Sequence, residues 1–149
     1  MKLMIIIAVL ILLAIGLRLA IPGMGASVAG GVVTDNGQQS LADCPGTPNC
    51  QRDTLTIGGE PSQAIRTMAT LIGENSHTQI VTQDEQYLHA TWSSPIMGFI
   101  DDVEFLLVQP ENGEQPVLQV RSASRLGKSD LGANAARIDT LRNDSQGRL

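Results

Sequence analysis

The sequence predicts an α+β fold, in which an antiparallel sheet of four to five strands carries two helices on one face and follows an N-terminal membrane segment. Three observations support this prediction. The chain begins with an uncharged apolar run, two later segments alternate apolar and polar residues around Asn112-Gly113, and two segments repeat apolar residues at helical spacing. Of the 149 residues, about 110 follow the apolar run, which is enough for one domain.

The apolar run extends from Leu3 to Leu17. A membrane-spanning helix needs about 20 apolar residues and the core of a signal peptide about 7 to 15, so this run fits between the two. Pro22 interrupts the segment, and Arg18 could reach the membrane surface from a helix continued past it. We expect residues 1–22 to be a transmembrane anchor or signal segment, with an uncleaved anchor favoured over cleavage after Ala29.

The rest of the chain is acidic. It holds 8 of the 10 Lys and Arg residues and all 15 Asp and Glu residues, which gives a net charge of −7. With two His and four aromatic residues in the whole chain, it lacks both the basic face and the stacking surfaces that nucleic acids require. We therefore expect no nucleic-acid partner.

Residues 23–43 are rich in Gly, Ser, Asn and Gln with little apolar periodicity, which is typical of a flexible linker. The two cysteines follow at Cys44 and Cys50, in a loop that contains Pro45 and Pro48. In an exported protein this pair favours a disulfide. A reactive dithiol and a metal site are the alternatives, although the first normally has a two-residue spacing and the second four ligands.

Four motifs occur in order along the chain: CPGTPNC from Cys44, YLHATW from Tyr87, DDVEF from Asp101 and RSASRLGKSDLGAN from Arg121. Together they resemble the family known as domain of unknown function 1499 over residues 44–142. The resemblance implies a bacterial or plastid-associated protein that follows a signal or membrane segment, and it implies no catalytic residue. We expect the globular domain over residues 44–149.

A helix is expected over residues 61–72. Pro61 suits a first helical position, and Gly73 can end the helix. Four apolar residues recur on one face between them: Ile65, Met68, Ala69 and Ile72. This spacing predicts packing against the sheet.

Residues 78–83 and 86–93 predict two strands joined at Asp84-Glu85, with Val81 opposite Leu88. Alternation directs three side chains to the core: Leu88, Ala90 and Trp92. It directs three to the other face: Tyr87, His89 and Thr91. A lone histidine on a strand is more often hydrogen-bonded or at the surface than a ligand or base, so we expect a structural role for it.

The next two strands surround Asn112-Gly113, a dipeptide that favours a two-residue turn. With that turn, Val103, Phe105 and Leu107 face the core. The cross-strand partners are then Phe105 and Val120, Leu107 and Leu118, and Glu104 and Arg121. Pro110 and Pro116 weaken the outer part of this hairpin, because each lacks a backbone N–H.

A second helix is expected after the following loop, with Ser129 or Asp130 as its N-cap. Four apolar residues at helical spacing define its inner face: Leu131, Ala135, Ile138 and Leu141. Asn134 lies on the same predicted face.

Two interpretations fit the charged residues around this helix. In the first, basic side chains and the helix N-terminus receive a carboxylate or phosphate. The candidate residues for this anion site are Arg121, Arg125, Lys128 and Asn134. In the second, which we favour because Asp101, Asp102 and Glu104 supply one acid for each base, the charges form a structural ion-pair network. Its members are Asp102, Glu104 and Arg121.

No metal site is expected, because alternation sends Asp101 to the opposite face from Asp102 and Glu104 and leaves two carboxylates beside arginines. The sequence also lacks the G-x-S-x-G, P-loop and HExxH motifs. We predict no catalytic residue and no cofactor, and an enzyme is disfavoured.

We therefore expect a membrane-anchored domain on the periplasmic or extracellular side, acting as a non-catalytic binding or interaction module of the cell envelope. The alternative is an enzyme or carrier for a small anionic ligand at the arginine cluster. The corresponding partners are an envelope protein and a carboxylate or phosphate. Carboxylates holding every arginine would favour the first function, and a pocket with an unpaired guanidinium the second.

Overall fold

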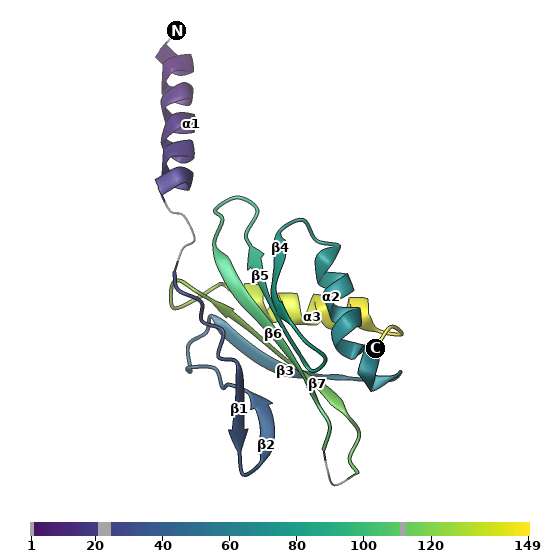
Figure 1. Ribbon diagram of the computed structural model, residues 1–149. Helices are drawn as coiled ribbons and strands as arrows, with labels where there is room; N and C mark the ends of the chain where they lie inside the picture. Colours follow the sequence, from purple (N-terminus) through teal and green to yellow (C-terminus); the bar gives the residue numbers. More distant parts are fainter. Residues whose placement is uncertain (1, 21–24, 111–112) are drawn as a thin grey trace.

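The computed structural model describes residues 2–20, 25–110 and 113–149 (Figure 1). The helices in this part of the chain are α1 (Lys2–Ala20), the single 3-10 turn η1 (Pro61–Gln63), α2 (Ala64–Gly73) and α3 (Ala133–Ser145). The strands are β1 (Val32–Asp35), β2 (Gln38–Leu41), β3 (Cys50–Thr56), β4 (Thr78–Gln83), β5 (Tyr87–Ser93), β6 (Ile100–Val108) and β7 (Val117–Ser124).

Strands β3 to β7 form one antiparallel sheet in the order β3-β7-β6-β5-β4, while β1 and β2 form a separate hairpin. The predicted α+β class with an antiparallel sheet is confirmed. The two longest strands, β6 and β7, are neighbours inside this sheet, and they contribute most of the sheet's buried side chains.

The main core lies between the sheet and helices α2 and α3. Alternate residues of β6 and β7 point into it, and on β6 these are Val103, Phe105 and Leu107. Helix α2 contributes the predicted face of Ile65, Met68, Ala69 and Ile72, all of them buried. This agreement follows from the strong helical spacing of the apolar residues in α2.

The opposite face of the sheet is covered as well. The β1–β2 hairpin places Leu41 against Leu106 and Val108, and Tyr87 and Val117 complete this smaller apolar cluster. Figure 1 shows the hairpin on the side of the sheet away from α2 and α3. In place of the flexible linker expected over residues 23–43, the described part of that range is folded onto the sheet.

The register of the central hairpin agrees with the prediction. Glu104 pairs with Arg121, Phe105 with Val120 and Leu107 with Leu118. The predicted turn at Asn112 lies partly outside the described residues. The register is fixed all the same, because a slip of one residue would turn Glu104 and Arg121 into the apolar core.

The register between β4 and β5 differs from the prediction. Leu88 pairs with Gln83 instead of Val81, because Asp84 N–H donates to the Tyr87 carbonyl and Glu85 and Gln86 form the turn in place of Asp84 and Glu85. A bulge between Ile80 and Thr82 then shifts the rest of the pairing by one residue. The assignment of faces on β5 is nevertheless correct. Leu88 and Ala90 lie in the main core with Trp92 packed against it, and Tyr87 and His89 lie on the other side.

The predicted inner face of α3 is confirmed for Asn134, Ile138 and Leu141 and is wrong for Leu131 and Ala135. Its buried residues are Asn134, Ile138, Leu141 and Ser145. Leu131 is 98% exposed and precedes the helix, and Ala135 is exposed. The inner face also includes Ser145, a polar residue that the apolar spacing did not indicate.

Helix α1 contains the apolar N-terminal run, and the side chains of residues 3–13 are exposed. Among the described residues, no helix combines the length and the apolarity needed to cross a membrane. The structure thus gives no support to the transmembrane reading of residues 1–22, of which residues 1, 21 and 22 lie outside the described ranges.

Candidate functional site

Two fully buried carboxylates lie on the face of the sheet opposite the helices. Asp102 and Glu104 alternate with the core residues of β6, so the strand pleat directs them away from α2 and α3. Each has no measurable exposure to solvent. We call the ionisable side chains gathered here the buried charge cluster: Tyr87, His89, Asp102, Glu104, Arg121 and Arg125.

Asp102 is held by side chains from β5 and from the end of β7. Arg125 donates two hydrogen bonds of 2.9 Å, from Nε to Oδ2 and from Nη2 to Oδ1. His89 Nε2 lies 2.7 Å from Oδ1. A bidentate guanidinium is the strongest partner that a buried carboxylate can have, because it supplies both charge and matched geometry.

Glu104 is held in the same way by its neighbours on the sheet. Arg121 Nη1 donates to Oε2 at 2.8 Å, and the Tyr87 hydroxyl donates to Oε1 at 2.7 Å. Arg121 is itself buried, and its Nε is the buried side-chain atom that lacks a hydrogen-bond partner among the described residues. Both members of the Glu104–Arg121 ion pair are therefore shielded from water.

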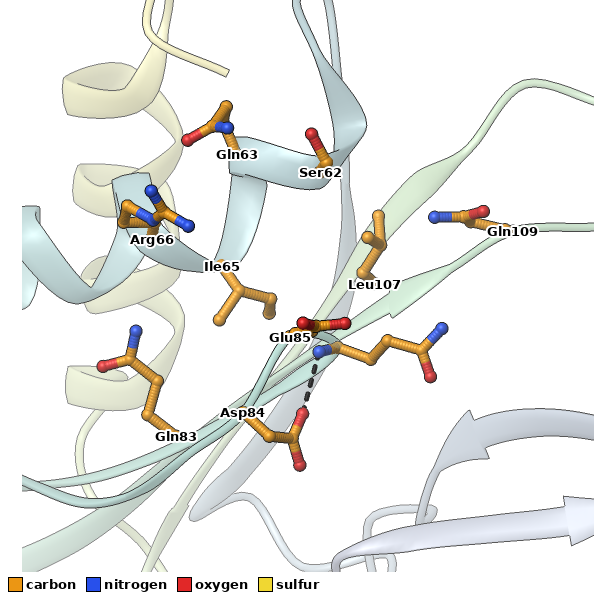
Figure 2. Close-up of a pocket in the computed structure, with 10 residues that line it drawn as sticks. Ser62, Gln63, Ile65, Arg66, Gln83, Asp84, Glu85, Leu107 and Gln109 are labelled. Atoms are coloured by element: carbon orange, nitrogen blue, oxygen red, sulfur yellow. Dashed lines mark hydrogen bonds between the residues drawn. The ribbon is translucent and has the colours of Figure 1, made fainter.

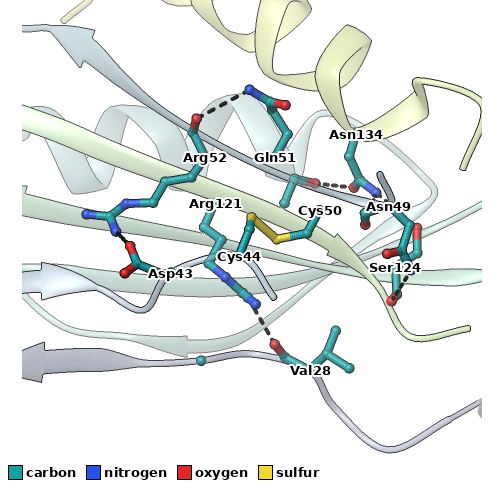
Figure 3. The surroundings of a disulfide bond; sticks show 12 residues. Val28, Asp43, Cys44, Asn49, Cys50, Gln51, Arg52, Arg121, Ser124 and Asn134 are labelled. Atoms are coloured by element: carbon teal, nitrogen blue, oxygen red, sulfur yellow. Dashed lines mark hydrogen bonds and ion pairs between the residues drawn. A yellow bond between two sulfur atoms is a disulfide. The ribbon is translucent and has the colours of Figure 1, made fainter. Parts of the chain in front are cut away.

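The remaining hydrogen bonds come from residues 25–31, which we call the N-terminal strap. Val28 N–H donates to Asp102 at 2.8 Å, and the Gly30 and Gly31 N–H groups donate to the two oxygens of Glu104 at 3.0 and 2.7 Å. In return, the Val28 carbonyl accepts a 2.9 Å hydrogen bond from Arg121 Nη1 (Figure 3). The strap closes the cluster by satisfying its charges with backbone groups.

Gly30 shows why the strap can come so close. A Cβ at this position would overlap the Cβ of Ala42 and would lie 3.6 Å from the Arg121 guanidinium carbon. The neighbouring Gly31 has φ 66°, a conformation that favours glycine. The Gly30-Gly31 pair therefore lets two consecutive amides reach one carboxylate.

The cluster does not have the order of a catalytic triad. Ser27 Oγ donates to Asp102 Oδ1 at 3.0 Å, so the carboxylate binds both the hydroxyl and the imidazole of His89. In a triad the imidazole lies between serine and acid, where it can take the hydroxyl proton. The observed arrangement holds groups in place without activating a nucleophile.

Electrostatics of the cluster favour a fixed protonation state. Burial by itself would raise the pKa of Asp102, but the hydrogen bonds from Arg125, Val28 and His89 outweigh it and lower the pKa to about 2. Burial, together with the hydrogen bond to Glu104, raises the pKa of Tyr87 above its ordinary value. Asp102 therefore stays ionised and Tyr87 neutral across the physiological range.

The structure separates the residues of the predicted anion site. Arg121 and Arg125 lie in the buried charge cluster, each bound to a carboxylate. Asn134 lies on the other side of the sheet, where its side-chain amide donates to the Asn49 carbonyl at 3.0 Å. Lys128 is exposed in the loop before α3. The four residues do not converge on one place.

Asn134 instead belongs to a second polar network under α3. Arg137 reaches over Trp92, with its guanidinium carbon 5.0 Å from the ring centre, and donates to Asp101 Oδ2 at 2.6 Å. Ser122 Oγ accepts from the same guanidinium. The alternation argument correctly placed Asp101 on the face opposite Asp102.

The start of α3 is also close to the prediction. The helix begins at Ala133, and the residue in the N-cap position is Gly132. The Asp130 carboxylate nevertheless accepts from the N–H groups of Gly132 and Asn134 at 3.1 and 2.7 Å. Burial alone would raise the pKa of Asp130, but these hydrogen bonds lower it. The Asp130 side chain therefore caps the N-terminus of α3.

The two cysteines form a disulfide between Cys44 and Cys50 at the edge of the sheet (Figure 3). The disulfide closes the short loop that connects β2 to β3. The favoured reading of the cysteine pair is thus confirmed over the dithiol and metal alternatives. In the described part of the chain, no three His, Cys, Asp or Glu side chains are placed to hold a metal ion.

A groove of about 600 Å³ lies at the end of the sheet away from the disulfide (Figure 2). It is lined by α2 and η1 on one side and by the β4–β5 turn on the other. Its polar side chains are those of Ser62, Gln63, Arg66, Gln83, Asp84, Glu85, Gln86 and Gln109. Arg66 is exposed and takes part in none of the ion pairs of the described residues. The groove was not predicted, because its lining comes from three segments with no shared motif.

The strap was also missed by sequence reasoning. Its contacts with Asp102 and Glu104 are made chiefly by backbone N–H groups, which every residue except proline possesses. The one available signal was the Gly30-Gly31 pair, since adjacent glycines can mark a close approach of the backbone.

Fold and site together define a small disulfide-bonded α+β domain whose central charges are closed off by its own N-terminal strap. The chain belongs to the family described as Protein of unknown function (DUF1499), whose model matches residues 39–144. This confirms the resemblance of the four motifs. No curated protein matches the chain.

Proposed function

We propose that this protein is a membrane-tethered, extracytoplasmic binding module of the cell envelope that carries out no catalysis. One observation carries the proposal. The carboxylates and guanidinium groups of the buried charge cluster are bound to each other and to the strap, whereas the polar groove at the end of the sheet is open to solvent.

The disulfide supports the compartment. Disulfides persist in secreted, periplasmic and surface proteins, and cytosolic reductants normally keep thiols reduced. The bond between Cys44 and Cys50 is therefore what an extracytoplasmic domain would contain.

The N-terminal helix supports attachment to a membrane. Its side chains from Leu3 to Leu13 include none with a charge, and every one of them is exposed. An apolar surface of this extent on a helix is normally covered by protein or lipid. We propose that a lipid bilayer covers the apolar side chains of α1, which precedes the folded domain in the chain.

The groove supports a polypeptide partner. Four glutamine side chains line it: Gln63, Gln83, Gln86 and Gln109. Carboxamides carry both donors and acceptors, so they match the N–H and C=O groups of an extended chain. Arg66, Asp84 and Glu85 add charges of both signs, which suits a partner segment that carries acidic and basic side chains.

Site-specific photo-cross-linking in intact cells tests the binding function. A photoreactive amino acid replaces Gln83 in the groove or Asp144, an exposed residue of α3, in the matched control. We expect a discrete protein adduct from position 83 and none from position 144. The same adducts from both positions, or none from either, would contradict binding at the groove.

A carbonate wash tests the tether in the same cells. An attached protein stays in the membrane fraction at alkaline pH. A soluble product whose N-terminus begins near Gly30 would instead establish that residues 1–29 are a cleaved signal segment.

The geometry gives less support to the alternative of an enzyme or carrier for a small anion at the arginine cluster. Such a ligand would have to displace Asp102 from Arg125 or Glu104 from Arg121. A thermal-unfolding screen with phosphates and carboxylates tests it. Stabilisation by one anion that disappears in Arg125→Met would favour the alternative.

A further inference from the structure

Outside α1, five of the nine exposed large apolar side chains of the described chain lie in two loops, and the other four lie on β1 and β4. These loops are residues 94–99 between β5 and β6, and residues 125–132 between β7 and α3. Leu131 is 98% exposed and Ile96 is 83% exposed, the two highest values among the large apolar residues of the domain. The remaining members are Met97, Phe99 and Leu126. We call these five residues the apolar tip.

The two loops lie side by side. Asp101 at the start of β6 pairs with Ser124 at the end of β7, so the loops leave the sheet from neighbouring strands. The Arg125 N–H also donates to the Ile100 carbonyl at 3.1 Å. Figure 1 shows both loops at the end of the sheet nearest to α1. The apolar tip is therefore one surface and not two unrelated ones.

The N-terminal strap begins at this same end. A Cβ on Gly25 would lie 3.0 Å from the Cβ of Arg125, so the strap starts against the second loop. Five residue steps separate Gly25 from Ala20, the last residue of α1. They span at most about 18 Å when fully extended. Whatever surface holds the end of α1 therefore also lies within reach of the apolar tip.

The opposite end of the domain has the reverse character. Four acidic residues of the hairpin turns are exposed there: Asp35, Asp84, Glu85 and Glu114. The loop of the apolar tip contains the exposed cation Lys128. Because membranes carry negative surface charge, this distribution favours an orientation with the acidic end away from the bilayer and Lys128 beside the headgroups.

Leu131 is the most informative member. It has φ 55°, a left-handed conformation that is unfavourable for a bulky residue, and it makes no use of its side chain in the core. Its apolar side chain is instead held outward beyond the start of α3.

We propose that the apolar tip inserts into the interfacial layer of the bilayer that holds α1. The domain then contacts the membrane directly, in addition to its attachment through α1. The inference rests on the membrane tether of the proposed function. Side chains such as leucine, isoleucine and phenylalanine bury about 5–10 Å into this layer in proteins that dock on membranes.

Fluorescence quenching by brominated lipids tests the docking. The full chain carrying Leu131→Trp or Ile96→Trp is reconstituted into phosphatidylcholine and phosphatidylglycerol vesicles with brominated acyl chains. The control is Val81→Trp, which replaces an apolar residue of the β4 bulge that is 52% exposed. The signal of the native Trp92 is common to all and is subtracted. Vesicle flotation is measured on the same samples, and a cooperative thermal unfolding transition of each variant verifies folding.

We expect the chain to float with the vesicles, and the added tryptophan at 131 and at 96 to be quenched at least about twofold more than that at 81. Flotation with equal quenching at all three positions would overturn the docking and leave the tether in place. Failure to float would overturn the tether, and the docking with it, because an inserted tip requires the chain on the vesicle.

Discussion

At the residue scale, the buried carboxylates Asp102 and Glu104 are stable only because every oxygen has partners. Taking a carboxylate out of water costs several kcal/mol, which a single ion pair does not always offset. Glu104 therefore combines the Arg121 guanidinium with the Tyr87 hydroxyl and two strap amides. Such a site is sensitive to the loss of any one member.

Arg121→Met should lower the free energy of unfolding by about 3 kcal/mol, because it leaves the buried Glu104 carboxylate without its counter-charge. Adding Glu104→Gln should recover part of this loss, since the amide is neutral. Urea unfolding of the wild type, both single variants and the double variant gives the coupling energy. Additive losses would show that the two side chains do not act as a pair.

Arg142→Met is the matched control for this cycle. Arg142 also binds carboxylates, those of Asp53 and Asp139, but at the surface. Exposed ion pairs contribute less than about 1 kcal/mol, so this variant should unfold at nearly the wild-type urea concentration.

Asp102 should make the domain sensitive to acid in a defined range. Its pKa falls from an ordinary 3.8 to about 2 in the folded protein. A lowered folded pKa gives a stabilisation that is complete above the unfolded pKa and is lost as the pH falls toward the folded one. The difference corresponds to about 2 kcal/mol.

The measurement is the free energy of unfolding at a series of pH values from neutral down to about 2. Asp102→Asn should be less stable at neutral pH and should show a flatter decline in the acid range. The exposed control Asp144→Asn should keep the wild-type slope. An unchanged slope in Asp102→Asn would assign the acid sensitivity to other groups.

At the scale of elements, the sequence indicated the central hairpin well and the strap poorly. The register of β6 and β7 was predictable because a one-residue slip would bury Glu104 and Arg121 among apolar side chains. The bulge at Val81 was not predictable from the sequence, because the residues before and after it still alternate as they do in a regular strand. In α3 the spacing of Ile138 and Leu141 indicated the inner face, but it gave no signal for Ser145, which is polar and buried.

Gly30→Ala should loosen the strap. The added methyl group would collide with Ala42, and a strained contact of this kind costs about 1–3 kcal/mol. Hydrogen exchange of the Gly31 amide should become faster, because its hydrogen bond to Glu104 opens more often. Gly73→Ala is the control, since that glycine ends α2 with open space around it. It should leave the Gly31 amide unchanged.

The disulfide makes a smaller, local contribution. Closing a loop as short as that between Cys44 and Cys50 stabilises the domain by about 2 kcal/mol, because little entropy is removed from the unfolded chain. Intact-mass analysis after alkylation should find no modified cysteine until a reductant is added, and the reduced protein should unfold at a lower temperature. Free alkylation in protein isolated without reductant would argue against an oxidising compartment.

At the scale of the whole molecule, the sheet is covered on both faces, by α2 and α3 on one and by the strap and the β1–β2 hairpin on the other. The folded unit therefore begins near Gly25, well before the cysteine that opens the strongest sequence motif. The strap binds Asp102, Glu104 and Arg121 at the centre of the sheet through its backbone groups.

This leads to a comparison of two truncated chains, expressed in an oxidising compartment. Residues 25–149 keep the strap and should unfold as one stable domain. Residues 32–149 keep both cysteines, the β1–β2 hairpin and the sheet but lose the amides that bind Asp102 and Glu104. Each hydrogen bond to a charged group is worth about 1.5–3 kcal/mol, although water entering the opened face will offset part of the loss. A small domain has about 5–15 kcal/mol in total, so the shorter chain should be marginal or unfolded at room temperature. Equal urea midpoints for the two chains would mean that the strap covers the charge cluster without stabilising it.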